Sequence, residues 1–476
     1  MFSLFNWSNK TEFNGSTPSG LKHEKFFEEL RAQEFQRLDD ERQVYLDYTG
    51  GNLHSISQLR KHTELLTRNV LGNPHSTNPT SLLATNLVDE AREKVKSFFN
   101  ADDYVCIFTP NATGALKIIG ECYPFNKEAH LLLLADNHNS VNGIREYCRK
   151  NGGSFSYSPL VIEDLELDHL KLEENLSRFE NIERKLFAFP GQSNASGVKH
   201  DLKWIKKAAD NGWDVLLDAA AYSPTNKLDL KEVSPDFVSI SFYKIFGFPT
   251  GLGCLLVKKS KFELLNKQWF AGGTISIVSV NHPGHFLLNA HERFENGTIN
   301  YLDIPAIKTG LDFIESIGMT RINERVNSLI QYLYDELNKL KHDTGVAQLN
   351  LLGPANRSRT GGNLIMTFNN PDGSLIPFDL IESKANEMKI SIRSGCFCNP
   401  GIDEANHCIT SNELESYFTS RDKGDYYELT HHLNRLRGST RASVGIPTTK
   451  RDIDSYIKFV RSLKDKTFVR EESVLV

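Results

Sequence analysis

The chain has 476 residues, of which 39% are hydrophobic, and a formal net charge of −5. This length allows a large core and two domains, and the lack of a long basic block argues against nucleic-acid binding. The seven cysteines are scattered and do not fit a secreted disulfide framework. The N-terminus becomes polar too early for a signal peptide, and apolar runs such as Leu131–Ala135 are too short to span a bilayer. We therefore expect a cytoplasmic protein without membrane contact.

In chain order, residues 1–43 form a lead and a helix ahead of the main body. Residues 1–22 are rich in Ser, Asn, Thr and Gly and are expected to be disordered. The charged, amphipathic run His23–Arg42 predicts a helix, and Val44–Tyr48 predicts a strand.

Residues 44–305 alternate between apolar strands and helical segments. This alternation predicts an α/β domain with a largely parallel sheet between helices. Beyond Ile304-Pro305, a long helix is expected from Ala306, followed by helices mixed with fewer strands, so 306–476 is assigned to a smaller α+β C-terminal domain. The expected strands of the large domain are Tyr104–Phe108, Leu131–Ala135, Leu186–Phe189, Val215–Asp218, Phe237–Phe242 and Cys254–Val257.

One lysine lies in a setting suited to imine chemistry. Lys244 follows the apolar run Phe237–Phe242, which predicts a buried strand, and precedes the glycine-rich turn Gly247–Gly253. A lysine that is desolvated at a strand end can lose its proton and act as a nucleophile. A surface lysine at the tip of a hairpin fits the same residues, so this motif alone leaves both interpretations open.

A buried acid is predicted upstream of that lysine. The apolar strand Trp213–Asp218 ends in an aspartate and is followed by Ala219–Ala221. An unpaired buried carboxylate is costly, and a pyridinium nitrogen is a suitable partner, as in a pyridoxal phosphate (PLP) site with a Schiff-base lysine. An ordinary helix N-cap is the other explanation for Asp218.

A phosphate cradle is predicted where a helix begins. The segment Phe108–Ala115 holds three small residues, Ala112, Thr113 and Gly114, ahead of a helix-like run. Free backbone N–H groups and the helix dipole favour an anion at such a terminus, and Thr113 can add a hydroxyl. Similar segments are common in ordinary loops, so this signal is weak by itself.

The order of these motifs resembles the class V, fold-type I PLP enzymes of the cysteine desulfurase group, and within it the desulfurase-like domain of molybdenum cofactor sulfurases. The likeness spans about residues 44 to 460 and is more specific than any single motif. It implies a fold-type I PLP-transferase architecture with a sheet of the seven-stranded type. The segments that carry it are Gly72–Ser76, Ala112–Gly114, Asn137-His138, Gln192–Asn194, Asp218–Ala221, Ser241–Gly247, Ala271–Thr274 and Arg393–Gly401.

The resemblance assigns roles to further residues. His138 would stack on the cofactor ring and carry protons, although a plain loop histidine is the commoner case. Asn194 would bond the cofactor's phenolic oxygen and Ser241 its phosphate. Thr298, in Phe294–Thr298, would reach the phosphate site of a neighbouring subunit, which implies a homodimer.

Two positions depart from ordinary cysteine desulfurases. Ala221 stands where those enzymes bring a Gln to the cofactor, and Tyr243 stands where a His commonly contacts the phosphate. Both differences also occur in the molybdenum cofactor sulfurase branch, so they favour that branch and keep Tyr243 as a cofactor-site residue. Neither difference removes Lys244 or Asp218.

By the same resemblance, Cys398 is the nucleophile that takes the substrate's sulfur as a persulfide. The thiolate is the reactive form, and a cation such as Arg393 would favour it. The pair Cys396-Phe-Cys398 lacks the second ligand pair of a zinc site, so we expect no metal. Cys408, next to His407, is a weaker candidate thiol or a loop feature.

Arg441, in Ser439–Gly445, resembles the arginine that binds the substrate's α-carboxylate, with Arg393 and Asn194 as further substrate contacts. A guanidinium fork suits a carboxylate, and a charged residue on an edge strand is the simpler alternative. The polar stretch Ser411–Arg437 resembles a helical insertion over the active site that could gate access.

These observations predict a PLP-dependent cysteine desulfurase that converts L-cysteine to L-alanine and leaves a persulfide on Cys398 for an acceptor protein or cofactor. Lys244 would hold PLP and, with His138, move the α-proton, while Asp218 keeps the ring nitrogen protonated. The chain ends at Val476 without a MOSC domain that could bind the molybdenum cofactor, so we expect a separate acceptor. The alternatives are a class V aminotransferase or lyase for another amino acid, and a PLP-binding partner protein without activity.

Overall fold

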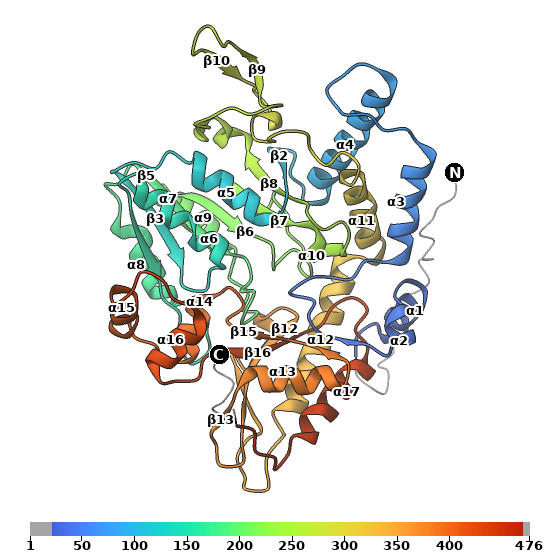
Figure 1. Ribbon diagram of the computed structural model, residues 1–476, viewed down its shortest axis with the longest axis vertical. Coiled ribbons are helices and arrows are strands. Elements are labelled where there is room, and N and C mark those ends of the chain that lie inside the picture. The colour runs from blue at the N-terminus through green and yellow to red at the C-terminus, as the bar shows by residue number, and fades with distance from the viewer. Residues whose placement is uncertain (1–20, 470–476) are drawn as a thin grey trace.

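A computed structural model describes residues 21–469 of the chain. In Figure 1, a central sheet covered by helices occupies the upper part of the molecule, and a smaller sheet with its own helices lies below it. The predicted α/β fold with a mostly parallel seven-stranded sheet is confirmed. Most of the expected N-terminal lead lies outside the described residues.

The central sheet has the strand order β2-β8-β7-β6-β5-β3-β4. Only β8 runs antiparallel to its neighbours, because the remaining pairs in the sheet are parallel. Helices cover both faces, which is why the inner strands are continuous apolar runs. The strands are β2 (Tyr104–Thr109), β3 (Ala129–Leu134), β4 (Ser154–Ser158), β5 (Arg184–Pro190), β6 (Asp214–Asp218), β7 (Phe237–Ser241) and β8 (Gly253–Lys258).

Alternate residues of each strand enter two different cores, as the two-residue period of a strand requires. Leu131 and Leu133 of β3 pack with α5 and α7, whereas Leu132 and Leu134 face the core that contains α4, α8, α9 and α11. The helices of this part are α3 (Ile56–Arg68), α4 (Pro79–Phe98), α5 (Ala112–Cys122), α6 (Asn139–Asn142), α7 (Ile144–Lys150), α8 (His169–Arg178), α9 (Lys203–Asp210), α10 (Phe242–Phe246) and α11 (Ile304–Ile317), with 3₁₀ turns η1 (Lys259–Leu264) and η2 (His291–Arg293).

The smaller sheet is antiparallel, in the order β11-β12-β16-β15, with β13 paired to β12. It gives the C-terminal part the predicted α+β character. Its elements are α12 (Met319–Leu337), β11 (Leu349–Leu352), η3 (Arg357–Arg359), β12 (Asn363–Asn369), β13 (Leu375–Ile376), α13 (Phe378–Glu387), β14 (Ile390–Ser391), β15 (Arg393–Gly395), α14 (Pro400–Asn406), α15 (Ser411–Thr419), α16 (Tyr426–Leu433), β16 (Ser439–Ser443) and α17 (Lys450–Ser462).

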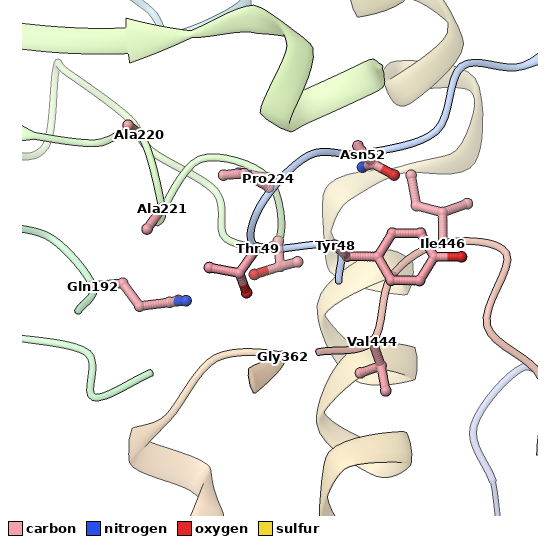
Figure 2. Close-up of a pocket in the computed structure, with 12 residues that line it drawn as sticks. Tyr48, Thr49, Asn52, Gln192, Ala220, Ala221, Pro224, Gly362, Val444 and Ile446 are labelled. Atoms are coloured by element: carbon pink, nitrogen blue, oxygen red, sulfur yellow. The ribbon is translucent and has the colours of Figure 1, made fainter. Parts of the chain in front are cut away.

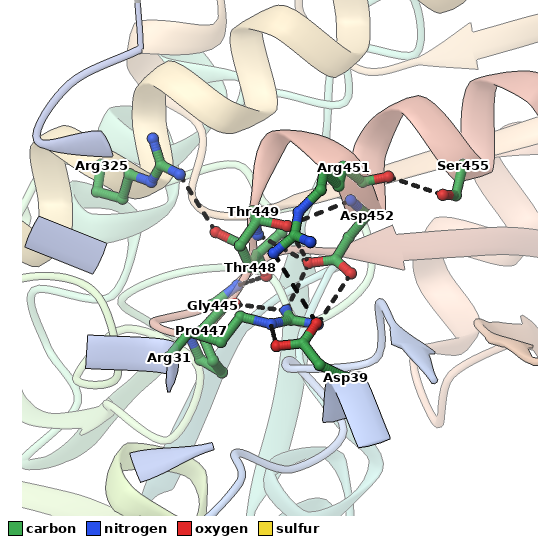
Figure 3. Close-up of polar contacts among 10 residues, drawn as sticks. All are labelled: Arg31, Asp39, Arg325, Gly445, Pro447, Thr448, Thr449, Arg451, Asp452 and Ser455. Atoms are coloured by element: carbon green, nitrogen blue, oxygen red, sulfur yellow. Dashed lines mark hydrogen bonds and ion pairs between the residues drawn. The ribbon is translucent and has the colours of Figure 1, made fainter. Parts of the chain in front are cut away.

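The N-terminal segment is tied to the C-terminal part. The predicted helix is divided into α1 (Glu24–Glu34) and α2 (Arg37–Asp40), and β1 (Val44–Tyr45), shorter than expected, pairs with β14. Figure 3 shows the guanidinium of Arg31 between two carboxylates, at 3.0 Å from Asp39 and 2.7 Å from Asp452. The first strand after the lead therefore belongs to the smaller sheets and not to the central one.

The long helix predicted from Ala306 begins as α11 and continues, after Gly318, as α12. α11 packs on α3, α4 and α10. Gly310 of α11 lies so close to Phe246 that a Cβ there would come within 2.2 Å of the ring. The division between residues 305 and 306 stays a prediction.

A hairpin of β9 (Ile275–Val278) and β10 (His285–Leu287) projects from the body at the top of Figure 1. It carries apolar side chains into solvent, because Ile277 is 61%, Val280 98% and Phe286 72% exposed. Within residues 21–469, no helix has both the length and the apolar character needed to cross a membrane.

Candidate active site

A cavity of about 260 Å³ lies where β3, β5, β6 and β7 end. Ligands bind at this edge of parallel α/β sheets because the connecting loops and helix termini converge there. The cavity collects most of the residues that the sequence predicts for the cofactor. These lining residues are Ala112, Thr113, His138, Asn194, Asp218, Ser241, Tyr243 and Lys244.

Lys244 faces this cavity from α10. The strand β7 ends at Ser241, one residue earlier than predicted, and Phe242 already begins the helix. Burial lowers the pKa of the Lys244 amine, and the carboxylate of Asp218 partly opposes this shift. The lysine is therefore not at an exposed hairpin tip, and its environment favours the neutral, nucleophilic amine.

Asp218 is the last residue of β6 and is buried beside the cavity. Its Oδ1 accepts hydrogen bonds from Ser239 Oγ at 2.7 Å and from the backbone N–H of Ala220 at 3.1 Å. The residues that follow form a turn and not a helix, so the N-cap interpretation is wrong. A buried carboxylate held in this way can stabilise a cation in the cavity.

The predicted phosphate cradle is the N-terminus of α5. Asn111 caps the helix and accepts a hydrogen bond from the Gly114 N–H at 2.9 Å, so that amide is already occupied. Thr113 Oγ1 lies 2.8 Å from Ser140 Oγ. Gly253 lets β8 approach this loop, because a Cβ there would lie 2.6 Å from the Asn111 carbonyl carbon. The remaining N–H groups and the helix dipole suit an anion.

His138 caps the short helix α6 at the carboxyl end of β3. Its Nδ1 accepts a hydrogen bond from the Ser140 N–H at 3.1 Å, so in the neutral ring the proton sits on Nε2. Burial lowers the pKa of His138, and Asp218 partly opposes the shift. A neutral imidazole in this position can carry a proton.

The loop that carries Cys398 is docked against the same edge of the sheet. Phe397 and Cys398 both adopt left-handed backbone conformations, with φ of 56° and 53°. The carbonyl oxygen of Cys398 accepts a hydrogen bond from the N–H of Asn139, the neighbour of His138, at 2.8 Å. The thiol is exposed.

Asn399 anchors this loop, a role that the sequence analysis missed. Its Nδ2 donates to the carbonyl oxygen of Asp136 at 2.7 Å and to Asn194 Oδ1 at 3.0 Å. Asn194 in turn donates from Nδ2 to the Phe397 carbonyl oxygen at 2.7 Å. Asn194 therefore lines the cavity and also binds the cysteine loop.

The other two cysteines of this region are less suited to the reaction. Cys396 is half-buried, and burial raises the pKa of its thiol. Cys408 is exposed but lies beyond α14, outside the loop that is bonded to Asn139; neither Cys398 nor Cys408 lines the cavity. All seven cysteines of the chain are free.

The two predicted substrate arginines lie side by side. Arg441 on β16 is paired in register with Arg393 on β15. The strand β16 lies between β12 and β15, so the edge-strand alternative for Arg441 is wrong. Arg441 Nη1 donates to the carbonyl oxygen of Asn194 at 2.7 Å, and the charges of both arginines act on Lys244. Neither arginine lines the cavity directly.

Asp47 joins these arginines and was also missed. Arg441 Nη2 lies 2.8 Å from its Oδ1, and Arg393 Nη2 lies 2.7 Å from its Oδ2. The only sequence signal is an acid between the apolar start of the segment and the Gly50-Gly51 pair.

Thr298 does not reach the cavity of its own chain and is exposed. Its contribution to a partner's site stays a prediction.

Ala221, the position that departs from ordinary desulfurases, borders both the main cavity and a second cavity of about 20 Å³, which is enough for one water molecule. Figure 2 shows this second cavity between Thr49, Ala221 and Val444, with Gln192 at one side.

The fold and this site together define a fold-type I PLP enzyme. The carboxyl-edge cavity, the backbone N–H groups for a phosphate at the N-terminus of α5, the buried acid and the desolvated lysine fit that cofactor, and PLP is the cofactor of the chain. Within residues 21–469, no group of three or more His, Cys, Asp or Glu side chains is arranged to hold a metal ion.

The sequence profile of the aminotransferase class-V family matches residues 44–456, and the chain belongs to this family. The molybdenum cofactor sulfurase of Arabidopsis thaliana is 34% identical over 94% of this chain and 58% of its own length. The molybdenum cofactor sulfurase of Homo sapiens is 35% identical over 91% of this chain and 51% of its own length. The chain thus spans only about half the length of these relatives.

Solved structures of the same fold agree with the predicted architecture. The apo cysteine desulfurase of Thermococcus onnurineus NA1 has a TM-score of 0.75 and 24% identity, and covers 92% of this chain and 97% of its own. The cysteine desulfurase CsdA of Escherichia coli has a TM-score of 0.72 and 20% identity, and covers 91% of this chain and 97% of its own. The predicted fold-type I architecture is therefore confirmed.

Proposed function

We propose that the chain is a PLP-dependent cysteine desulfurase that converts L-cysteine to L-alanine and forms a persulfide on Cys398. The observation that carries the proposal is the docked cysteine loop. The Cys398 carbonyl oxygen accepts a hydrogen bond from the N–H of Asn139, the residue after His138, so the loop that carries the thiol is fixed beside a residue that lines the cavity. An aminotransferase or a lyase for another amino acid has no need of a thiol at this place.

The residues divide the work of this reaction among them. When bound, PLP supplies an electron sink for the substrate's α-carbon. Lys244 and Asp218 hold the cofactor, and the Lys244 amine, whose pKa is lowered by burial, takes the α-proton. His138 is a second proton carrier, because its Nδ1 accepts a hydrogen bond and the proton of the neutral ring is on Nε2.

The sulfur transfer is a thiol displacement. The Cys398 thiolate attacks the substrate's sulfur, a new S–S bond forms, and the bond between that sulfur and Cβ breaks. The electron pair stays with Cβ, which takes a proton and becomes the methyl group of alanine. The product on the protein is a Cys398 persulfide, which requires no external oxidant.

The test is alanine formation from L-cysteine by the PLP-loaded protein. Cys398→Ala should abolish alanine, whereas the matched variant Cys408→Ala should keep it, because the equally exposed Cys408 lies beyond α14 and not on the loop bonded to Asn139. Lys244→Ala should lose the visible absorbance of the bound cofactor. Alanine formation that survives Cys398→Ala would refute Cys398 as the nucleophile, a keto acid in place of alanine would support the aminotransferase or lyase alternative, and bound PLP without turnover would support a non-catalytic partner protein.

We propose that a separate protein or cofactor accepts the sulfur, with the molybdenum cofactor as the first candidate. The support is the 34% identity to a molybdenum cofactor sulfurase, of which this chain spans 58%. Labelled cysteine would mark the Cys398 persulfide, and the label should then move to the acceptor. We also propose a cytoplasmic location, since seven free thiols suit a reducing compartment.

We propose that the protein works as a homodimer. The projecting hairpin exposes Ile277, Val280 and Phe286, and contiguous exposed apolar surface is typical of interfaces. The exposed Thr298 lies next to the base of this hairpin, where the Gly297 N–H donates to the Gly272 carbonyl at 2.8 Å. Sedimentation should give twice the monomer mass, and Val280→Asp should shift it to the monomer.

A further inference from the structure

Asp47 is the only acid that bonds the two substrate arginines within residues 21–469. Arg393 contributes two hydrogen bonds to its Oδ2, from Nε at 2.9 Å and from Nη2 at 2.7 Å. Arg441 contributes one to its Oδ1, from Nη2 at 2.8 Å. The carboxylate therefore holds both guanidinium groups with both of its oxygens.

The turn that follows β1 is built to present this carboxylate. The N–H groups of Gly50 and Gly51 donate to the Asp47 carbonyl at 3.0 and 3.2 Å. Tyr45 Oη donates to the Gly51 carbonyl at 2.9 Å and closes the turn. A Cβ at Gly50 would lie 2.5 Å from Asp47 Oδ2 and 2.9 Å from Arg393 Nη2, so only glycine leaves room for the ion pair.

The group has an uneven charge. Two guanidinium groups share one carboxylate, which leaves one positive charge beside Lys244. Arg441 and Asp47 are largely buried, with side-chain exposures of 3% and 11%, so water screens their charges weakly, whereas Arg393 is 54% exposed and its charge is partly screened. One substrate α-carboxylate would neutralise the remaining charge, and a second anionic group on the substrate would be left facing Asp47 without a counterion.

We propose that Asp47 is a specificity-determining residue that sets the charge of the substrate site, so that it accepts amino acids with a neutral side chain and disfavours those with an acidic one. This inference rests on the proposed function, because it assumes that Arg441 and Arg393 receive the α-carboxylate. It adds that the acid between them selects which amino acids bind well.

The test compares two amino acids that carry no sulfur to transfer, by calorimetry on the PLP-loaded protein. L-Serine has the shape of cysteine with a neutral side chain, and L-aspartate adds one anionic group. The wild type should bind serine more tightly, and Asp47→Asn should shift the ratio of the two dissociation constants toward aspartate by at least about tenfold. Asp102→Asn, which removes an exposed carboxylate paired with Lys231, should leave the ratio unchanged.

A double variant separates charge from structure. Asp47→Asn combined with Arg393→Gln restores the single positive charge and should restore the preference for serine. If Asp47→Asn weakens both ligands equally, or if the double variant keeps the altered ratio, Asp47 is structural and the inference is wrong. If the ratios behave as expected but L-cysteine yields no alanine, the desulfurase proposal fails and the charge selection stands.

Discussion

Replacing Asn399 with alanine tests whether docking of the cysteine loop controls sulfur transfer. The side chain is fully buried and makes three hydrogen bonds. Its Nδ2 donates to the Asp136 carbonyl and to Asn194 Oδ1, and its Oδ1 accepts from the Ile402 N–H at 3.3 Å as the N-cap of α14. The substitution removes all three and leaves two acceptors without a donor.

The cost follows from the number of groups left without a partner. A buried acceptor that loses its donor costs about 1 to 3 kcal/mol, and loss of an Asn N-cap costs about 1 kcal/mol. Water can reach the loop beside the exposed Cys398, so the lower end of the range applies to each of the two acceptors. Together with the N-cap, the total cost is about 3 kcal/mol. This corresponds to a ratio of docked to undocked loop that is about 100-fold smaller.

The assay is single-turnover alanine formation with a parallel measurement of cofactor absorbance. Asn399→Ala should slow alanine formation by up to about 100-fold and retain the cofactor, because Lys244 and Asp218 are unchanged and Asn194 loses only one of its contacts. The control is Asn78→Ala, which removes the Asn N-cap of α4 away from the site. A rate within about threefold of the wild type, or an equal loss in the control, would refute the reasoning.

Two further predictions concern stability. Arg31→Ala should lower the free energy of unfolding in urea by about 3 to 5 kcal/mol because it leaves buried Asp452 unpaired, whereas exposed Arg451→Ala should change it little, and equal effects would contradict this reasoning. Burial lowers the pKa of His130, which is stacked on Phe179, to about 4, so the fold favours the neutral ring. The contribution of neutral His130 to the free energy of unfolding is complete above pH 6.5. About 3 kcal/mol is lost as the pH falls toward 4. Thermal unfolding of His130→Gln across that range should not show this loss.

The inner strands could be predicted because burial on both faces leaves apolar runs in the sequence. The edge strand β4, Ser154–Ser158, could not, since its residues are polar or aromatic and it has a neighbour on one side only. The last residue of the predicted strand before Lys244 is the first of a helix, because a continuous apolar run does not reveal where its period changes.

Most of the predicted cofactor residues, which lie in local motifs, line the cavity, and two residues defined by distant contacts were missed. Asp47 is 346 residues from Arg393, and Asn399 is 263 residues from Asp136. Neither has a local pattern that distinguishes it from a common turn or cap. Only the fold brings such pairs together, so they could not be predicted from the spacing of residues along the sequence.

The union of the N-terminal turn with β16 has a consequence for biosynthesis. The cofactor cavity is formed by residues between 111 and 251 and can assemble once the ribosome has passed the middle of the chain. The hydrogen bond from Arg441 to Asp47 spans 394 residues and can form only after residue 441 has been synthesised. Under the proposed function, a nascent chain can therefore acquire PLP well before it can bind an amino acid, so a chain that has not yet reached Arg441 cannot start the proposed reaction.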